Sequence, residues 1–362
     1  MKKDFKYLLL LLLIFLSSLA ALVIPKKNKL KKNYLNTPAN TKSKMTDSSI
    51  NQQVQEETVL AAKDAPEKRT ENDQQIKVAN IRFGVVVKDY SNNTGQISGL
   101  ENTLEKIVST VGIYKQFGLP TNQYLVETDL AYIKNAGKIL LLAWEPWNPN
   151  EGTNQSIDYL KEIAEGKHDD YITTFARQVK NYSSPVLLRF AHEMNGNWYP
   201  WGTRPSEYVS AYRRIVEVFH SQGTDNVKFV WSINHESVPY EPISQCQKYF
   251  PGEAYVDIIG IDGFNFGTSR NNSTWKSFDN IFSPAYSFVS TAYPEKPIII
   301  TEVGSTEFGG NKNKWIDEMF ASLANMPKIQ EIIWFNLLKE TDWRIDSSTT
   351  STEAFQRNLS TL

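Results

Sequence analysis

Cysteine and histidine are both scarce in this 362-residue sequence. Cys246 is the only cysteine, so the chain contains no intramolecular disulfide. The residues around Cys246 offer neither a base nor positive charge, so we interpret it as structural. The four histidines lack a metal-ligand spacing such as His-Glu-x-x-His; they are His168, His192, His220 and His235. We therefore expect no catalytic metal and no cofactor, while a structural Ca²⁺ stays open.

The formal net charge is only −1, but the charge is unevenly distributed. Residues 1–32 carry eight lysines and one aspartate, so the remainder of the chain is acidic. An acidic body argues against a nucleic-acid partner and suits a neutral substrate. Aromatic residues, in contrast, are plentiful at 12% of the chain. Their flat apolar faces with polar edges suit sugar binding, although a large aromatic core would give the same composition.

Residues 1–24 combine a basic start with an apolar run, Tyr7 to Ile24. We predict a signal peptide or a membrane anchor and favour the anchor, since the run is long for a signal core. The lysines between 26 and 32 would favour a cytoplasmic position for that side, which conflicts with export. The rest of the chain is still expected to be extracytoplasmic and membrane-anchored, or secreted if the segment is cleaved.

Residues 25–78 are rich in Lys, Asn, Gln, Ser, Thr and Glu and show no sustained period. Such a segment buries too little apolar surface to offset its ordering entropy, so we predict a disordered polar linker. Residues 79–362 are expected to form the folded domain.

Short apolar runs and amphipathic stretches alternate through that domain. The predicted strands are Ile81–Val87, Gly112–Phe117, Lys138–Trp144, Pro185–Ala191, Val227–Ser232, Val256–Ile261, Pro297–Thr301 and Ile329–Phe335. The clearest predicted helices are Asp169–Lys180, Ser206–His220, Ile281–Ala292 and Asn313–Ala324. Eight such units predict an α/β fold of the (β/α)8 TIM-barrel class. An open doubly wound sheet is the alternative, but no glycine-rich phosphate loop follows the first strand.

Two glutamates, Glu193 and Glu302, follow the fourth and seventh predicted strands. In a TIM barrel the carboxyl ends of the strands share one mouth, so the two side chains are expected to meet there. Paired carboxylates are what glycoside hydrolysis requires. Trp198–Trp201 would give Glu193 an apolar wall that keeps it protonated as acid/base. The nucleophile Glu302 could be held ionised by His192 or Arg189.

The run Arg189–Gly202 (RFAHEMNGNWYPWG) resembles the acid/base region of glycoside hydrolase family 26. Thr301–Gly304 resembles that family's nucleophile strand, and Val256–Asn265 its sixth strand. The resemblance implies a retaining endo-glycosidase that cleaves β-1,4-mannan or β-1,3-1,4-glucan by double displacement. It also implies that His192 contacts the nucleophile and the sugar at the cleavage subsite.

Phe264 departs from this family pattern. The sixth strand of the family usually carries Asp-Gly-Tyr, and the tyrosine hydroxyl bonds the nucleophile, whereas here the sequence is Asp262-Gly263-Phe264. Losing that donor would weaken the positioning of the nucleophile. Another donor must compensate, or activity is reduced or tuned to a different substrate.

Further residues are expected to bind the polysaccharide. Trp147, Trp198 and Trp334 are placed in the cleft as sugar platforms, with core packing as the alternative for each. Glu145 and Asp262 could bond sugar hydroxyls or form ion pairs with Arg189 or a lysine. The remaining predicted substrate-binding residues are Arg189, His192, Asn195 and Phe264.

Three functions stay open from the sequence. The first is an endo-β-glycanase, and the second is a tethered enzyme that trims or transglycosylates an exopolysaccharide. The third is a weakly active or non-catalytic carbohydrate-binding barrel. Phe264 keeps this alternative open, because it lacks the hydroxyl of the tyrosine that the family usually has there. The expected partners are a polysaccharide and, through residues 1–24, a membrane; a monomer is expected.

Overall fold

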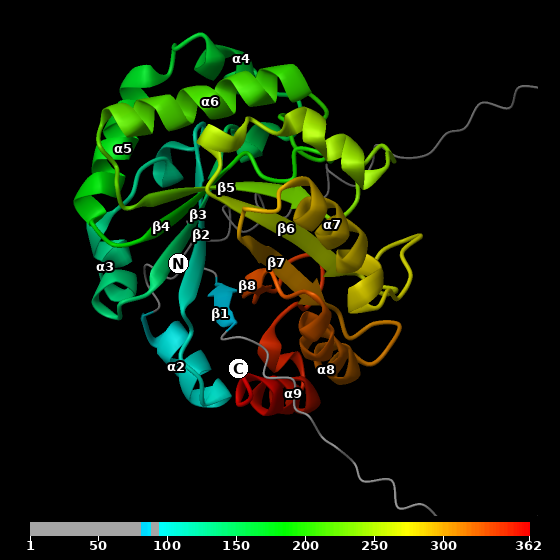
Figure 1. The fold of residues 1–362 in the computed structure, drawn as a ribbon. Helices are drawn as coiled ribbons and strands as arrows, with labels where there is room; N and C mark the ends of the chain where they lie inside the picture. Colours follow the sequence, from blue (N-terminus) through cyan, green and yellow to red (C-terminus); the bar gives the residue numbers. More distant parts are fainter. Residues whose placement is uncertain (1–80, 88–93) are drawn as a thin grey trace, which may run out of the picture. The chain divides into compact units, whose positions relative to one another are not determined.

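The computed structural model describes residues 81–87 and 94–362 (Figure 1). The predicted signal or anchor (1–24) and the predicted linker (25–78) lie outside these described residues. Within the two described ranges, no helix is both long enough and apolar enough to cross a membrane.

Eight parallel strands close into a barrel in chain order, which confirms the predicted (β/α)8 class. The strands are β1 Arg82–Val86, β2 Thr110–Gln116, β3 Ile139–Glu145, β4 Val186–Phe190, β5 Val227–Asn234, β6 Ile258–Asn265, β7 Ile298–Ser305 and β8 Ile329–Phe335. Strands β5, β6 and β7 run two to four residues beyond their predicted ends. The predicted ends were Ser232, Ile261 and Thr301, whereas the ladder continues to polar residues such as Asn234 and Asn265.

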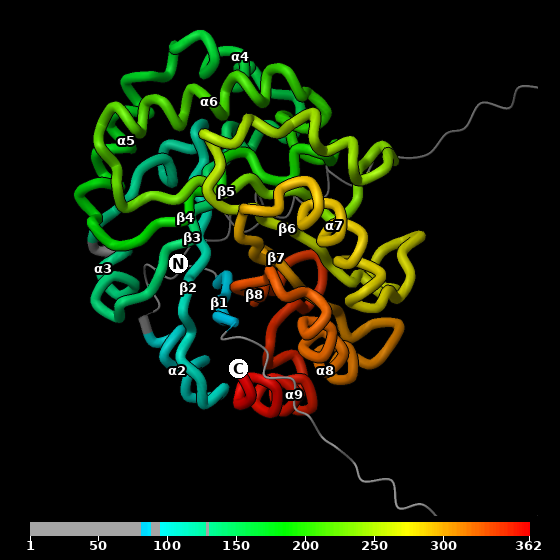
Figure 2. Tube along the Cα trace, viewed as in Figure 1, coloured from blue at the N-terminus to red at the C-terminus, as the bar shows by residue number. Residues whose placement is uncertain are grey.

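Helices surround the barrel (Figure 1), and the trace in Figure 2 shows the first and last of them, α2 and α9, side by side. The α-helices are α2 Thr94–Leu104, α3 Glu127–Asn135, α4 Tyr159–Ala164, α5 Asp169–Tyr182, α6 Pro205–Ser221, α7 Phe278–Ala292, α8 Lys312–Ser322 and α9 Thr349–Leu359. Short 3₁₀ segments lie at Pro120–Asn122, Pro149–Glu151, Ile243–Tyr249, Glu253–Tyr255, Leu323–Asn325 and Ile345–Ser347. The four helices expected from the sequence are α5, α6, α7 and α8.

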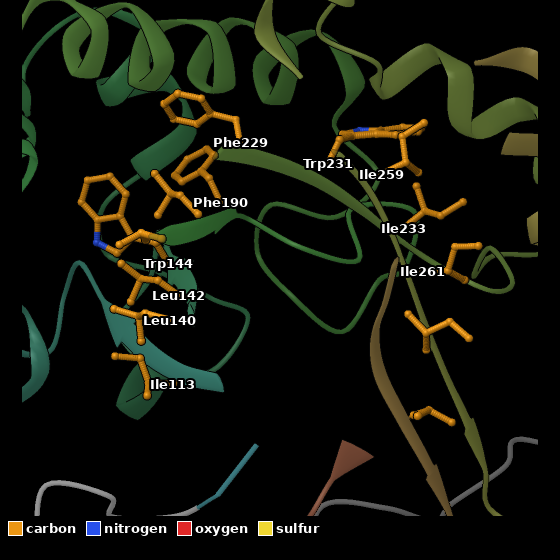
Figure 3. Close-up of a cluster of buried hydrophobic side chains, with 14 of the residues drawn as sticks. Ile113, Leu140, Leu142, Trp144, Phe190, Phe229, Trp231, Ile233, Ile259 and Ile261 are labelled. Atoms are coloured by element: carbon orange, nitrogen blue, oxygen red, sulfur yellow. The ribbon is translucent and has the colours of Figure 1, made fainter. Parts of the chain in front are cut away.

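Side chains along each strand alternate between two apolar layers. One layer packs between the sheet and the helices; Figure 3 labels its members Ile113, Leu140, Leu142, Trp144, Phe190, Phe229, Trp231, Ile233, Ile259 and Ile261. The other fills the barrel interior with Val86, Leu141, Leu187, Val230, Ile299 and Ile333. This two-residue period decides which residues near a strand end can reach the mouth of the barrel.

Trp334 corrects one sequence prediction. It belongs to the outer layer, where its ring lies 4.8 Å from Phe355 and its indole Nε1 donates to the carbonyl of Trp343 at 2.7 Å. It is fully buried and therefore does not serve as a sugar platform in the cleft. Its neighbours on β8, Ile333 and Phe335, are the residues that face the interior.

An irregularity in β7 changes the alternation just before Glu302. Ile300 pairs with Ile261 of β6, but Glu302 pairs with the very next residue, Asp262, so Thr301 is an extra residue in the ladder. The pairing with β8 shifts over the same stretch. A bulge of this kind re-aims side chains. As a result Thr301 and Glu302 both contact inward-facing partners, although strict alternation would send one of them outward.

Candidate active site

Glu193 lies three residues beyond the end of β4, in a turn with unusual backbone geometry. Ala191 and Glu193 have φ angles of 47° and 54°, the left-handed region that residues other than glycine seldom occupy. The Glu193 amide donates to the Ser232 carbonyl at 2.9 Å, which ties the turn to β5. Backbone strain that the surroundings hold in place is common at functional sites. Here it turns the carboxyl group into the barrel mouth.

Among the described residues, the donors to the Glu193 carboxyl are both neutral. Asn234 Nδ2 donates to Oε1 at 2.8 Å, and Trp198 Nε1 donates to Oε2 at 2.7 Å. Burial, together with the negative charges of Asp262 and Glu302, raises the pKa of Glu193 to about 8, although those two hydrogen bonds oppose the rise. The environment therefore favours a protonated carboxyl at neutral pH.

Asn195, which the sequence placed among the substrate-binding residues, supports this arrangement through hydrogen bonds to the end of β5 and the residues after it. Its Nδ2 donates to the Asn234 carbonyl at 3.0 Å, and its Oδ1 accepts from the Asn234 amide at 2.8 Å. Further bonds reach Glu236 and Ser237, and the side chain is buried. Asn195 thus fixes the end of β5 from which Asn234 holds Glu193.

Glu302, on β7, is held through a single carboxylate oxygen. Oε1 accepts from the guanidinium of Arg189 and from the hydroxyl of Tyr114, the latter at 2.5 Å. Among the hydrogen bonds of the described residues, none reaches Oε2. Of the two holders considered from the sequence, His192 and Arg189, it is Arg189 that makes the contact.

Arg189 and Asp262 form a buried ion pair at 2.8 Å beneath Glu302. Asp262 also accepts from Thr301 at 2.6 Å and from Ser232 at 2.8 Å. Burial raises the pKa of Asp262, while the Arg189 guanidinium and the two hydroxyl donors oppose that rise. Both side chains are buried, and their polar atoms contact each other and neighbouring protein groups. The alternative ion pair with Arg189 is what the structure contains.

His192 and Glu145 lie at the mouth beside Tyr199. His192 Nε2 is 3.2 Å from the Tyr199 hydroxyl and 4.0 Å from Glu145 Oε1, so its nearest polar partner is not Glu302. Burial holds the pKa of His192 well below its usual value, so the imidazole is neutral. Glu145 Oε2 accepts from Gln116 Nε2 at 2.6 Å and from Trp147 Nε1 at 3.1 Å. Burial also raises the pKa of Glu145.

Aromatic side chains build one wall of the mouth. Tyr199 and Trp201 stack with ring centroids 4.3 Å apart, and Trp147 meets Tyr199 edge-on at 5.3 Å. Trp147 and Trp198 are partly exposed, as a sugar platform requires. Phe264 is also partly exposed and packs against Trp343 at 5.1 Å.

His235 and Cys246 are two further buried groups. His235 follows Asn234 at the end of β5, and burial lowers its pKa to about 4. Within the described part of the chain, no group of three or more His, Cys, Asp or Glu side chains could hold a metal ion. Cys246 is buried, as its structural interpretation requires.

Sequence reasoning missed Tyr114, Gln116 and Asn234. Tyr114 and Gln116 alternate on the inward face of β2, and Asn234 lies two residues after Ser232 on β5. The two-residue period was the available signal. That period shows which residues face inward, but it does not show which of them come into contact, because barrel closure brings together strands that are far apart in the sequence.

A sequence model described as glycosyl hydrolase family 26 matches residues 146–308. Endoglucanase H of Acetivibrio thermocellus is 39% identical over 248 residues, which cover 64% of this chain and 26% of that protein. Mannan endo-1,4-beta-mannosidase of Bacillus subtilis (strain 168) is 27% identical over 146 residues, covering 37% of this chain and 34% of that protein. The chain thus spans about a quarter to a third of the length of these relatives.

Solved structures share the fold. A family 26 beta-mannanase from Bacteroides ovatus superposes with a TM-score of 0.61 at 17% identity, covering 78% of this chain and 88% of that one. A modular endo-beta-1,4-mannanase from Cellulomonas fimi superposes with a TM-score of 0.57 at 16% identity, covering 78% and 71%. At these identities the likeness is one of fold.

Proposed function

The chain belongs to glycoside hydrolase family 26, and on that premise we propose that it is a retaining endo-glycosidase acting on a β-linked polysaccharide. Glu193 is the acid/base and Glu302 the nucleophile. The observation that carries this proposal is the opposite setting of the two carboxyl groups. Glu193 is buried among neutral donors, whereas Glu302 is paired with a guanidinium and keeps one oxygen unbonded within the described structure.

The two settings match the two steps of double displacement. In the first step Glu302 Oε2 attacks the anomeric carbon, the glycosidic C–O bond breaks, and the proton of Glu193 passes to the leaving oxygen. This leaves a glycosyl ester on Glu302 and a carboxylate on Glu193. In the second step Glu193 takes a proton from water, the water oxygen attacks the anomeric carbon, and the ester bond to Glu302 breaks. Configuration at the anomeric carbon is retained.

Glucan of mixed β-1,3 and β-1,4 linkage is the substrate class we favour, with β-1,4-mannan as the second candidate. The relative named endoglucanase is 39% identical, whereas those named mannan endo-1,4-beta-mannosidase are 24% to 33% identical. The name endoglucanase describes a protein about four times longer than the matched segment, so the substrate needs a direct assay.

The roles of the two glutamates are tested with Glu193→Ala and Glu302→Ala on dinitrophenyl β-glycosides. Dinitrophenolate leaves without protonation, so Glu193→Ala should still form the glycosyl-enzyme, and added azide should release it as the β-glycosyl azide. Glu302→Ala with azide should give the α-glycosyl azide, because azide then replaces the nucleophile. The exposed-surface variant Glu318→Gln is the control. Identical products from the two variants would contradict the assignment.

A panel of mixed-linkage glucan, cellulose and mannan then identifies the substrate by release of reducing ends. Cleavage of mannan alone would reject our preference for glucan. Polysaccharide binding without any cleavage by the wild-type chain would favour the carbohydrate-binding barrel over the enzyme.

We also propose that the barrel is extracytoplasmic and tethered through residues 1–24. The support is the apolar run of that segment and the polymeric nature of the proposed substrate. Protease added to intact cells should digest the barrel, with a cytoplasmic protein as the protected control. Protection of the barrel would reject this location.

A further inference from the structure

The geometry points to Tyr114, on β2, as the residue that positions the nucleophile. Its hydroxyl donates a hydrogen bond to Glu302, which Phe264 on β6 cannot do because it has no hydroxyl. This inference rests on the proposed function, since it assigns how Glu302 is held for attack. In the closed barrel β2 lies opposite β6, so the hydroxyl reaches the carboxylate from another direction than position 264 would.

The contact itself is short and specific. Tyr114 Oη donates to Glu302 Oε1 at 2.5 Å, and the same oxygen accepts from Arg189. Two donors on one oxygen fix the plane of the carboxylate. They also draw its negative charge towards Oε1, beside the positive charge of Arg189. The other oxygen, Oε2, is then the one presented to the sugar.

The Phe264 side chain packs against other aromatic rings. Its ring lies 5.1 Å from Trp343, 5.4 Å from Phe335 and 6.0 Å from Phe266. A phenylalanine ring has no hydroxyl to donate, so the strand that pairs with β7 contributes no such bond from this position. The donor must come from elsewhere, and Tyr114 is the hydroxyl in contact.

The end of β2 is built to hold Tyr114 in place. Asn122 Nδ2 donates to the Tyr114 carbonyl at 2.9 Å and to Gln116 Oε1 at 2.6 Å. Gln116 in turn donates to Glu145 on β3. The Tyr114 ring packs against the interior cluster and lies 6.2 Å from the His192 ring. Preorganisation of this kind lowers the cost of holding the nucleophile in a reactive geometry.

The hydroxyl also keeps its proton throughout the working range. Burial, reinforced by the neighbouring Glu302 charge, holds the pKa of Tyr114 well above its usual value. Tyr114 therefore stays protonated at every pH below its raised pKa and can donate to Glu302 throughout.

The test is Tyr114→Phe, which removes one oxygen atom and keeps the ring. Because a hydrogen bond to a charged group is lost, kcat should fall about 10- to 100-fold with little change in KM. Trapping of Glu302 by a fluorinated aryl glycoside, followed by mass spectrometry, should slow by a similar factor.

Tyr212→Phe is the matched control, because Tyr212 is buried on α6 and its hydroxyl has no partner within the described structure. It should leave kcat and the rate of trapping at Glu302 unchanged. The double variant Tyr114→Phe with Phe264→Tyr should recover part of kcat, by returning a hydroxyl to the inward face of β6.

Two results separate the possible failures. If Tyr114→Phe keeps its kcat and its rate of trapping at Glu302 while Glu302→Ala is inactive, the role of Tyr114 is overturned and the proposed function stands. If the wild-type chain cleaves nothing and is not labelled at Glu302, the proposed function fails first and the inference falls with it.

Discussion

Two inward-facing glutamates, one at each end of the barrel, have similar partners but differ in how many of their carboxylate oxygens accept hydrogen bonds. Glu302, at the carboxyl end of the strands, contacts Arg189 and the Tyr114 hydroxyl. Glu331, at the amino end of β8, contacts Arg82 and the hydroxyls of Ser109 and Thr110. Each is therefore a carboxylate held by one guanidinium and at least one hydroxyl group.

The difference lies in how the carboxylate oxygens are used. In Glu331 both oxygens have donors, Oε2 from Arg82 at 3.0 Å and Oε1 from Ser109 at 2.9 Å, and the side chain is 0% exposed. In Glu302 both donors converge on Oε1, and 6% of the side chain remains exposed. An arginine partner alone does not mark a catalytic carboxylate. A held but incompletely bonded carboxylate, at the end of the barrel where loops form a mouth, fits the nucleophile role that we propose for Glu302.

The largest effect that would test this comparison is Glu302→Gln against Glu331→Gln. The first should lower kcat by about 10,000-fold, because the nucleophile is removed, while the protein still folds. The second should leave kcat of the folded protein near the wild-type value and lower the free energy of unfolding by about 1–3 kcal/mol, because Arg82 loses its charged partner. Steady-state kinetics and urea denaturation measure the two quantities. Loss of activity in both variants, with both folded, would remove the distinction.

The next effect concerns pH and Glu193. Its pKa of about 8 means that the acid form is lost above that pH, so kcat/KM should fall about tenfold per pH unit there. Glu193→Gln should lack this limb.

The pH dependence of stability should also reflect the titration of Glu193. A carboxyl whose pKa is raised on folding contributes stability below its unfolded value of 4.5 and loses it as the pH rises towards about 8. Glu193→Gln cannot ionise, so its Tm should rise relative to wild type between pH 5 and pH 8.5. Thermal melts at the two pH values check this, and a constant difference in Tm would contradict the raised pKa.

The smallest effect compares two tryptophans, one at the mouth and one in the outer layer. Trp147→Ala should raise KM about tenfold by removing a stacking face, with a modest change in kcat. Trp334→Phe should leave KM unchanged and lower the free energy of unfolding by about 1–3 kcal/mol, since it loses packing and the bond to Trp343. Equal KM values in the two variants would contradict the separation of the layers.

Much of this architecture could be predicted from the sequence, for local reasons. Apolar runs of Ile, Leu and Val placed all eight strands, because a strand buried on both faces has to be apolar along its length. Glu193 was found through its neighbours in the chain, since Trp198 and His192 lie within five residues of it. Residues that act together and are also close in sequence leave a pattern that can be read directly.

The errors have one common cause. Trp334 was placed in the cleft because it precedes a strand end, yet its position on the two-residue period turns it toward Phe355 on α9. Asn195 and Asp262 were assigned to the sugar because they lie near the catalytic residues, yet other buried groups use their polar atoms. Proximity in sequence does not reveal which way a side chain points or whether it already has partners.

The sequence by itself determined the barrel and the presence of two carboxyl groups at strand ends, because both depend on composition and local order. Only the tertiary structure decided how Glu302 is held. The bulge at Thr301 turns Glu302 inward, and barrel closure brings Tyr114 to within 2.5 Å across 188 positions of sequence. Contacts between distant strands depend on the register and curvature of the closed sheet, and no local pattern encodes them.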